Sequence, residues 1–158
     1  MKGIVHIRID DRLIHGQVAA FWTNSLSISR IMVINDEVAD DEMQKSLLRM
    51  VAPASVRTSI INKETAVKNI LAGKYEGQRV LVIVKNPKDL WDLKEAGLDI
   101  KKLNVGNMAT REGTRSIKRS VNVTDIDICY FNKLLEAGVD IDAIMVPDDK
   151  ECKLKDLL

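Results

Sequence analysis

The chain has 158 residues, of which 46% are hydrophobic and 30% charged, and its 24 basic and 23 acidic side chains give a formal net charge of +1. This length is typical of one domain with a substantial core. The balanced charge argues against binding nucleic acid by phosphate neutralisation, and the aromatic content of 4% argues against a base-stacking surface. The longest apolar runs, such as Val80–Val84, are far shorter than the roughly 20 residues that span a bilayer.

Short β-branched runs recur along the chain and predict strands at Ile4–Ile9, Ile31–Ile34, Val56–Ile61, Val80–Val84, Leu103–Val105, Val121–Val123 and Ile141–Val146. Several of these runs are almost continuously apolar, as strands buried on both faces are. Segments with apolar residues at helical spacing lie between them. We therefore expect an α/β fold, with an open, mostly parallel twisted sheet of about seven strands and helices on both faces.

The helices are expected in chain order between these strands. Their apolar stripes, or the residues that start and stop them, are Val18–Phe21–Trp22–Leu26, Met43–Leu47–Met50–Val51, Asn62 to Gly73, Asn86-Pro87 to Gly97, and Thr124 with Asp127 to Gly138. Asparagine and threonine are good N-caps and glycine is a common stop. A short helix over Asp149–Leu158 is also predicted. Phe21, Trp22 and Trp91 are expected in the core.

The stretch between Val105 and Val121 breaks the alternation, because it contains two glycines and no helical apolar stripe. We expect a long loop or hairpin there, and long loops in compact domains are often functional. Its four basic residues against Glu112 give it a net charge of +3. A solvated loop is the ordinary interpretation; the alternative is that Arg111 and Arg115 border the site and steer a partner.

The turn from the first strand into the first helix holds the most informative residues, Arg8-Ile9-Asp10-Asp11-Arg12-Leu13-Ile14-His15-Gly16-Gln17. Ligands of open parallel sheets bind outside the carboxyl ends of the strands, and a helix start offers free amides and a positive dipole end to anions. The two arginines match phosphate oxygens. A histidine in this setting is a candidate phosphoryl acceptor, with a carboxylate to orient it. From the chemistry alone, a simple cap or surface histidine is about equally plausible.

The segment Arg8-Ile9-Asp10-Asp11-Arg12-Leu13-Ile14-His15-Gly16-Gln17-Val18 closely resembles the signature of IIB subunits in the mannose/sorbose/fructose family of the bacterial phosphoenolpyruvate:sugar phosphotransferase system. Further matches are Ile34–Ala39, Lys85-Asn86-Pro87, Asn104–Met108 and Val146-Pro147. The resemblance covers nearly the whole chain, residues 1–158, as a single IIB domain. The later matches resemble members that import amino sugars such as N-acetylgalactosamine.

The resemblance implies a phosphocarrier without a cofactor. The active histidine maps onto His15, which would accept a phosphoryl group from a phosphohistidine on IIA and pass it to a sugar arriving through the membrane subunits IIC and IID. Arg12 maps onto the phosphate-coordinating arginine, with Arg8, Asp10, Gly16 and Gln17 in support. The protein would be cytoplasmic and peripherally associated with the membrane subunits; a homodimer is one open alternative for its assembly.

Other polar residues have simpler interpretations. Asn35, Asp36 and Lys85 follow strands and border the site or cap helices, His6 is expected to be buried with a partner, and Cys129 is expected in the core. No spacing of His, Cys or carboxylates suggests a metal site, and no Gly-rich fingerprint suggests a nucleotide.

Two other functions compete with that of a phosphocarrier. A histidine phosphatase or mutase needs a second histidine beside the first, and His6, inside the same strand, does not supply it. A non-catalytic module that binds an anion or a phosphometabolite in the same loop remains the alternative.

Overall fold

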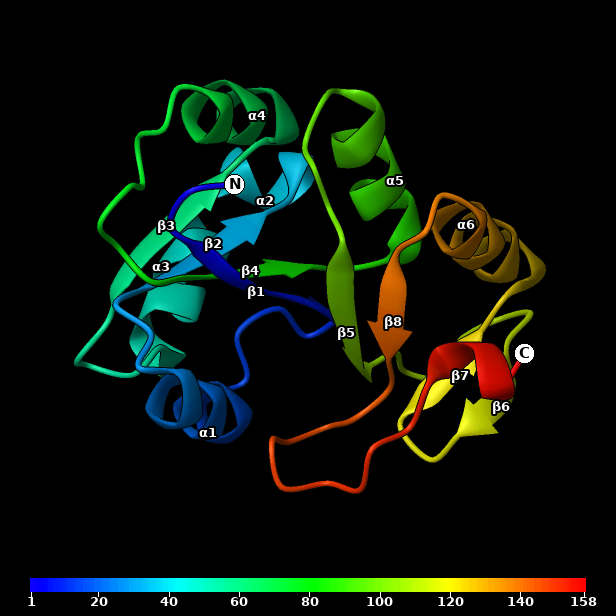
Figure 1. Ribbon diagram of the computed structural model, residues 1–158. Coiled ribbons are helices and arrows are strands. Elements are labelled where there is room, and N and C mark those ends of the chain that lie inside the picture. The colour runs from blue at the N-terminus through cyan, green and yellow to red at the C-terminus, as the bar shows by residue number, and fades with distance from the viewer.

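The computed structural model describes all 158 residues, and six parallel strands form its central sheet (Figure 1). In sheet order these strands are β3 (Arg57–Ile61), β2 (Arg30–Ile34), β4 (Val80–Val84), β1 (Ile4–Asp10), β5 (Lys102–Asn107) and β8 (Asp140–Asp142). A separate antiparallel hairpin pairs β6 (Arg115–Lys118) with β7 (Val121–Val123). The predicted α/β class is confirmed. The sheet has one strand fewer than expected because Val121–Val123 pairs in the hairpin, which also confirms a hairpin within the basic stretch.

Helices cover both faces of the sheet (Figure 1). On one face α1 (Gly16–Leu26), α2 (Asp36–Ala39) and α3 (Glu42–Val51) pack over a cluster of 12 buried apolar residues. On the other face α4 (Lys63–Leu71), α5 (Pro87–Glu95) and α6 (Asp125–Glu136) enclose a larger cluster of 25. None of these helices combines the length and apolar character needed to cross a membrane.

The predicted helix starts are confirmed by side-chain caps. Asn62, Asn86 and Thr124 each accept a hydrogen bond from the backbone amide three residues on. Thr124 and Asp127 also form the reciprocal pair of a capping box, which satisfies two orphan backbone donors of α6.

The C-terminal segment departs from the prediction. The strand expected over Ile141–Val146 ends at Asp142, and the helix expected over Asp149–Leu158 is only a 3₁₀ turn at Leu154–Asp156. The chain after residue 149 instead returns beside β8, where the Ala143 amide donates to the Cys152 carbonyl over 2.8 Å. This extended pairing uses backbone groups that a helix would need.

Two side chains expected inside lie outside. Phe21 is 50% exposed, because α1 turns the stripe containing Val18 and Trp22 toward the sheet and Phe21 falls beside that stripe. Cys129 is also exposed; it lies two residues from Asp127, on the side of α6 opposite its buried face. Trp22 is buried, as predicted, and Trp91 is partly buried against the larger cluster.

The strand order places a topological switch point between β1 and β5. The chain leaves β1 through α1 to reach β2 on one side, and it leaves β5 through the hairpin and α6 to reach β8 on the other. These two connections diverge, so the carboxyl ends of β1 and β5 flank the position where open α/β sheets bind ligands. The β1–α1 turn with His15 leaves the sheet at this point.

Candidate active site

His15 is the N-cap residue of α1 and stands in extended conformation at the end of a tight turn. That turn is closed by a 2.9 Å hydrogen bond from the Leu13 amide to the Asp10 carbonyl. Leu13 has a φ of +61° although its side chain is buried, a conformation that costs a β-carbon about 1–2 kcal/mol. The His15 side chain is exposed and makes no hydrogen bond with the protein. Both ring nitrogens are therefore free of protein partners.

The first turn of α1 has no capping side chain and no acidic residue. The other five α-helices are each capped by an Asn, Asp or Thr side chain. The amides at the start of α1 therefore keep their capacity to donate to an anion beside His15. Gly16 and Gln17 lie in this turn.

Arg12 is fixed by the carboxylate of Asp10. Its Nε and Nη2 donate to the two Asp10 oxygens, each over 2.9 Å, and the Arg12 amide donates to Oδ1. These hydrogen bonds raise the pKa of the Arg12 guanidinium above its ordinary value. Nη1 has no protein acceptor, and the side chain is 32% exposed. One edge of the guanidinium is thus pinned while the other can donate to a ligand.

Asp10 is held in turn by Arg8, which is buried on the same face of β1. Arg8 Nη2 donates to Asp10 Oδ2 over 3.1 Å, and Nη1 donates to Asn104 Oδ1 over 2.7 Å. The side-chain amide of Asn104 donates to the Asp142 carboxylate over 2.6 Å. Burial lowers the pKa of Arg8, while the charge of Asp10 opposes this. Asp10, Arg8, Asn104 and Asp142 thus form a buried polar row across β1, β5 and β8, in which each buried charge has a partner.

The row fits because Gly106 has no side chain. A β-carbon at Gly106 would lie 1.9 Å from Cζ of Arg8. Cζ of Arg8 also lies 5.7 Å from the centre of the Trp22 ring.

The segment after β8 closes over the same row. The Trp22 indole donates to the Met145 carbonyl over 3.0 Å, and the side-chain amide of Asn104 donates to the Ile144 carbonyl over 2.9 Å. Met145 Sδ also contacts both guanidinium groups. Ile144 and Met145 therefore lie against the row together with Trp22 of α1.

Asp11 ties the loop after β5 to the site. Its carboxylate accepts from the Asn107 side chain over 2.9 Å and from the Ala109 amide over 2.6 Å. The basic stretch thus begins beside the β1–α1 turn.

Five residues were expected to border the site, and the structure gives only some of them a structural role. Asn35 caps α2, and Asp36 accepts from the Lys63 amide. Lys85 leaves β4 beside Asp10, because Ile9 pairs with Val84 in register.

The two arginines of the basic stretch differ. Arg111 is ion-paired with Asp127 of α6. Arg115 is exposed on β6 and makes no ion pair.

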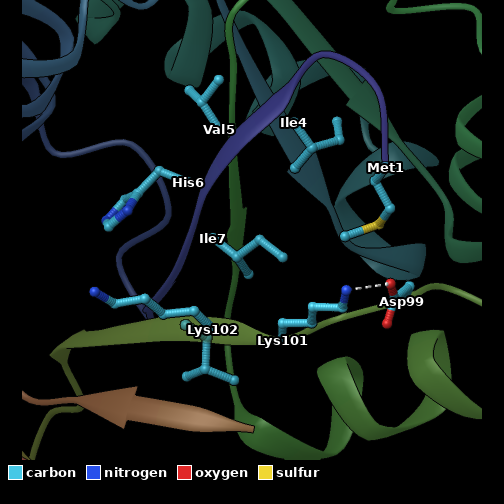
Figure 2. Close-up of a pocket in the computed structure, with 9 residues that line it drawn as sticks. Met1, Ile4, Val5, His6, Ile7, Asp99, Lys101 and Lys102 are labelled. Atoms are coloured by element: carbon cyan, nitrogen blue, oxygen red, sulfur yellow. Dashed lines mark ion pairs between the residues drawn. The ribbon is translucent and has the colours of Figure 1, made fainter.

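His6 continues the row toward the opposite end of β1. Its ring stacks on Trp22 with centroids 4.4 Å apart, and its buried Nε2 has no hydrogen-bond partner. Burial, and then the charge of Arg8, lower the pKa of His6 to about 4. Figure 2 shows His6 at a surface hollow with Lys101 and Lys102; the hollow does not include His15 or Arg12. Lys101 there pairs with Asp99 over 3.4 Å. His6 is therefore a neutral packing partner, and this hollow is separate from the site.

The chain matches the family model of the "PTS system sorbose subfamily IIB component" over residues 4–158. The chain belongs to this IIB family. It is 41% identical over 151 residues to the mannose-specific EIIAB component of Escherichia coli K12, covering 96% of this chain and 47% of that protein. It is 40% identical over 149 residues to the fructose-specific EIIB component of Bacillus subtilis 168, covering 94% of this chain and 91% of that protein.

Solved structures agree with the family assignment. The IIB domain of the Klebsiella pneumoniae sorbose permease superposes with a TM-score of 0.93 at 34% identity, covering 99% of this chain and 96% of that one. The chain spans about half the length of the mannose-specific EIIAB relatives it matches. Relatives named for mannose, fructose, sorbose and N-acetylgalactosamine all match, so these identities do not single out an amino sugar. The chain is thus a IIB component of the phosphotransferase-system family.

The sequence did not predict a site role for three residues: Asn104 and Asp142, which belong to the row, and Gly106, which makes room for Arg8. Asn104 and Gly106 lie in the matched segment Asn104–Met108, which carried no role. Their signal was a polar residue and a glycine inside a run that otherwise forms a buried strand.

Proposed function

We propose that this IIB chain is a phosphocarrier whose His15 accepts a phosphoryl group from a phosphohistidine of IIA and donates it to a sugar. The observation that carries the proposal is the exposed, unbonded ring of His15 at the uncapped start of α1, three residues after Arg12, whose guanidinium keeps one edge free. An incoming phosphoryl group meets amide and guanidinium donors there.

The transfer can be written with its electrons balanced. The lone pair of a His15 nitrogen attacks phosphorus, and the bond from phosphorus to the donor imidazole breaks and returns its electron pair to that nitrogen. In the second step a sugar hydroxyl attacks phosphorus, the bond to His15 breaks, and the hydroxyl proton is released to base or water. Arg12 and the α1 amides stabilise the phosphoryl oxygens in both steps.

Asp10 and Arg8 support this chemistry without touching the phosphoryl group. Asp10 keeps the free edge of Arg12 in place, and Arg8 holds Asp10 through a buried ion pair. We infer that the sugar is delivered by the membrane subunits IIC and IID, with this chain on their cytoplasmic side. We assign the choice of sugar, amino sugars included, to those subunits.

Reconstitution tests the proposal. Membrane vesicles with IIC and IID, supplied with phosphorylated IIA, should phosphorylate the imported sugar only when this chain is present. The His15→Ala variant should support no sugar phosphorylation. The alternative, a non-catalytic anion-binding module, predicts that the chain binds inorganic phosphate but leaves sugar phosphorylation unchanged.

A further inference from the structure

Helix α3 presents an apolar face that nothing in the chain covers. Met43, Leu47, Met50 and Val51 are 75%, 55%, 79% and 46% exposed, and no residue of the helix is fully buried. Their spacing places them on one side of the helix, while Leu48 packs against the core below. We call these four residues the α3 apolar face. Monomeric proteins seldom expose clustered apolar side chains of this size without a binding role.

This face adjoins the proposed phosphoryl acceptor. A β-carbon on Gly16, the residue after His15, would lie 3.0 Å from the carbonyl oxygen of Val51. The last turn of α3 therefore touches the first turn of α1, and Figure 1 shows the two helices on the same side of the sheet. The α3 apolar face starts at the rim of the site.

A phosphodonor protein has to cover this rim. Direct transfer holds each reacting nitrogen within about 3–3.5 Å of the phosphorus, so the donor surface must meet the surface around His15. A standard interface buries about 800 Å² on each partner, a disc with a radius of about 16 Å. An α-helix of ten residues is about 15 Å long. With one end against Gly16, all of α3 falls within such a footprint.

We propose that the α3 apolar face is the docking surface for the phosphodonor protein. This inference rests on the proposed function and names the partner contact of the same site. The donor should carry an apolar patch beside its phosphohistidine. Basic residues should flank that patch, because residues 36–51 hold five carboxylates against two cations, a net charge of −3.

Two other occupants fit less well. A second copy of this chain bound symmetrically through α3 would cover the rim of both His15 residues and keep the donor away. A bilayer surface with anionic headgroups would repel the net charge of −3.

The test compares surface variants of similar exposure. In the double variant Leu47→Ser/Met50→Ser, the KM for phosphorylated IIA should rise at least tenfold with kcat little changed. Phosphorylation of His15 by phosphoramidate, a donor too small to use the face, should proceed at the wild-type rate. Leu71→Ser, a variant of the 60% exposed leucine of α4 on the opposite side of the sheet, should leave both reactions unchanged.

Several results would overturn the docking assignment. One is a double variant with the wild-type KM for IIA while wild-type protein is phosphorylated normally. Others are a loss confined to transfer from phospho-His15 to sugar, or a wild-type dimer that dissociates in the double variant without a change in KM. Failure of IIA to phosphorylate even the wild-type chain would instead refute the proposed function, so the two ideas fail separately.

Discussion

Replacing Gly106 with alanine should disturb the position of Arg12 indirectly, through Arg8 and Asp10. The added β-carbon would lie 1.9 Å from Arg8 Cζ and 2.1 and 2.2 Å from its terminal nitrogens, far inside van der Waals contact. Gly106 does not have a positive φ, so the backbone accepts alanine and the cost comes from the collision. The guanidinium must shift by more than 1 Å, which breaks its contacts with Asp10 and Asn104.

The magnitude follows from what the shift breaks. Overpacking a core costs about 1–3 kcal/mol, and breaking a buried ion pair costs about 3–5 kcal/mol. Because Arg8 can keep part of its bonding after moving, we expect a loss of about 3 kcal/mol in the free energy of unfolding. For a protein of this size that lowers Tm by about 6–12 °C.

Transfer should also slow by at least about tenfold, which corresponds to 1.4 kcal/mol, because Asp10 no longer holds Arg12 in place. The assays are thermal unfolding and phosphotransfer from IIA at a temperature where circular dichroism shows the variant folded. Gly138→Ala is the control: its site is open but has a φ of +87°, so it should lose modest stability and keep the wild-type transfer rate. A Gly106→Ala variant with wild-type Tm and wild-type transfer would refute the relay from Arg8 to Arg12.

Three further perturbations test other parts of the site. Arg12→Ala should slow transfer by about tenfold to a hundredfold, since a charged hydrogen bond contributes about 1.5–3 kcal/mol, and Arg12→Lys should recover little of it because the fork is lost; a folded Arg12→Ala variant with the wild-type rate would contradict this role. The pKa of His6 is about 4 in the native state, against 6.5 unfolded, so the native state disfavours its protonation. The free energy of unfolding should therefore be highest above pH 6.5 and fall by about 2 kcal/mol as pH drops toward 4.5. Urea titrations should show a shallower decrease in His6→Phe, and identical pH slopes would refute the assignment. Transfer at limiting IIA should slow as salt rises from about 0.05 to 0.3 M, and Arg111→Ser/Arg115→Ser should flatten this dependence, whereas an unchanged slope would make the basic stretch ordinary solvated surface.

Local chemistry made the β1–α1 turn readable from the sequence. Asp10, Arg12 and His15 lie within six residues of one another, so strand end, turn and helix start are enough to place them together. Helix caps such as Asn86 and Thr124 were readable for the same reason, because each acts on an amide three residues away.

The buried row was not readable because it depends on strand register. Arg8 faces Asn104 and Asn104 faces Asp142 only after β1, β5 and β8 have paired. Periodicity marks the strands but gives neither their order nor the residue that stands opposite. The same limit hid the role of Gly106, which is defined by a side chain about 100 residues earlier.

Apolar spacing also does not say what covers a helix face. The stripe of Met43, Leu47 and Met50 correctly predicted a helix, but those side chains point away from the core. In the C-terminal segment, pairing with β8 outcompeted the local tendency to form a helix. Both differences arise from tertiary contacts, which a local pattern does not contain.

The position of the phosphoryl group tests the central claim most directly. After incubation with phosphorylated IIA, the chain should be digested under alkaline conditions and its peptides sequenced by mass spectrometry. The account predicts one acid-labile phosphoryl group, on His15, and none in the His15→Ala variant. A phosphoryl group on His6 or Cys129, or full labelling of His15→Ala, would contradict it.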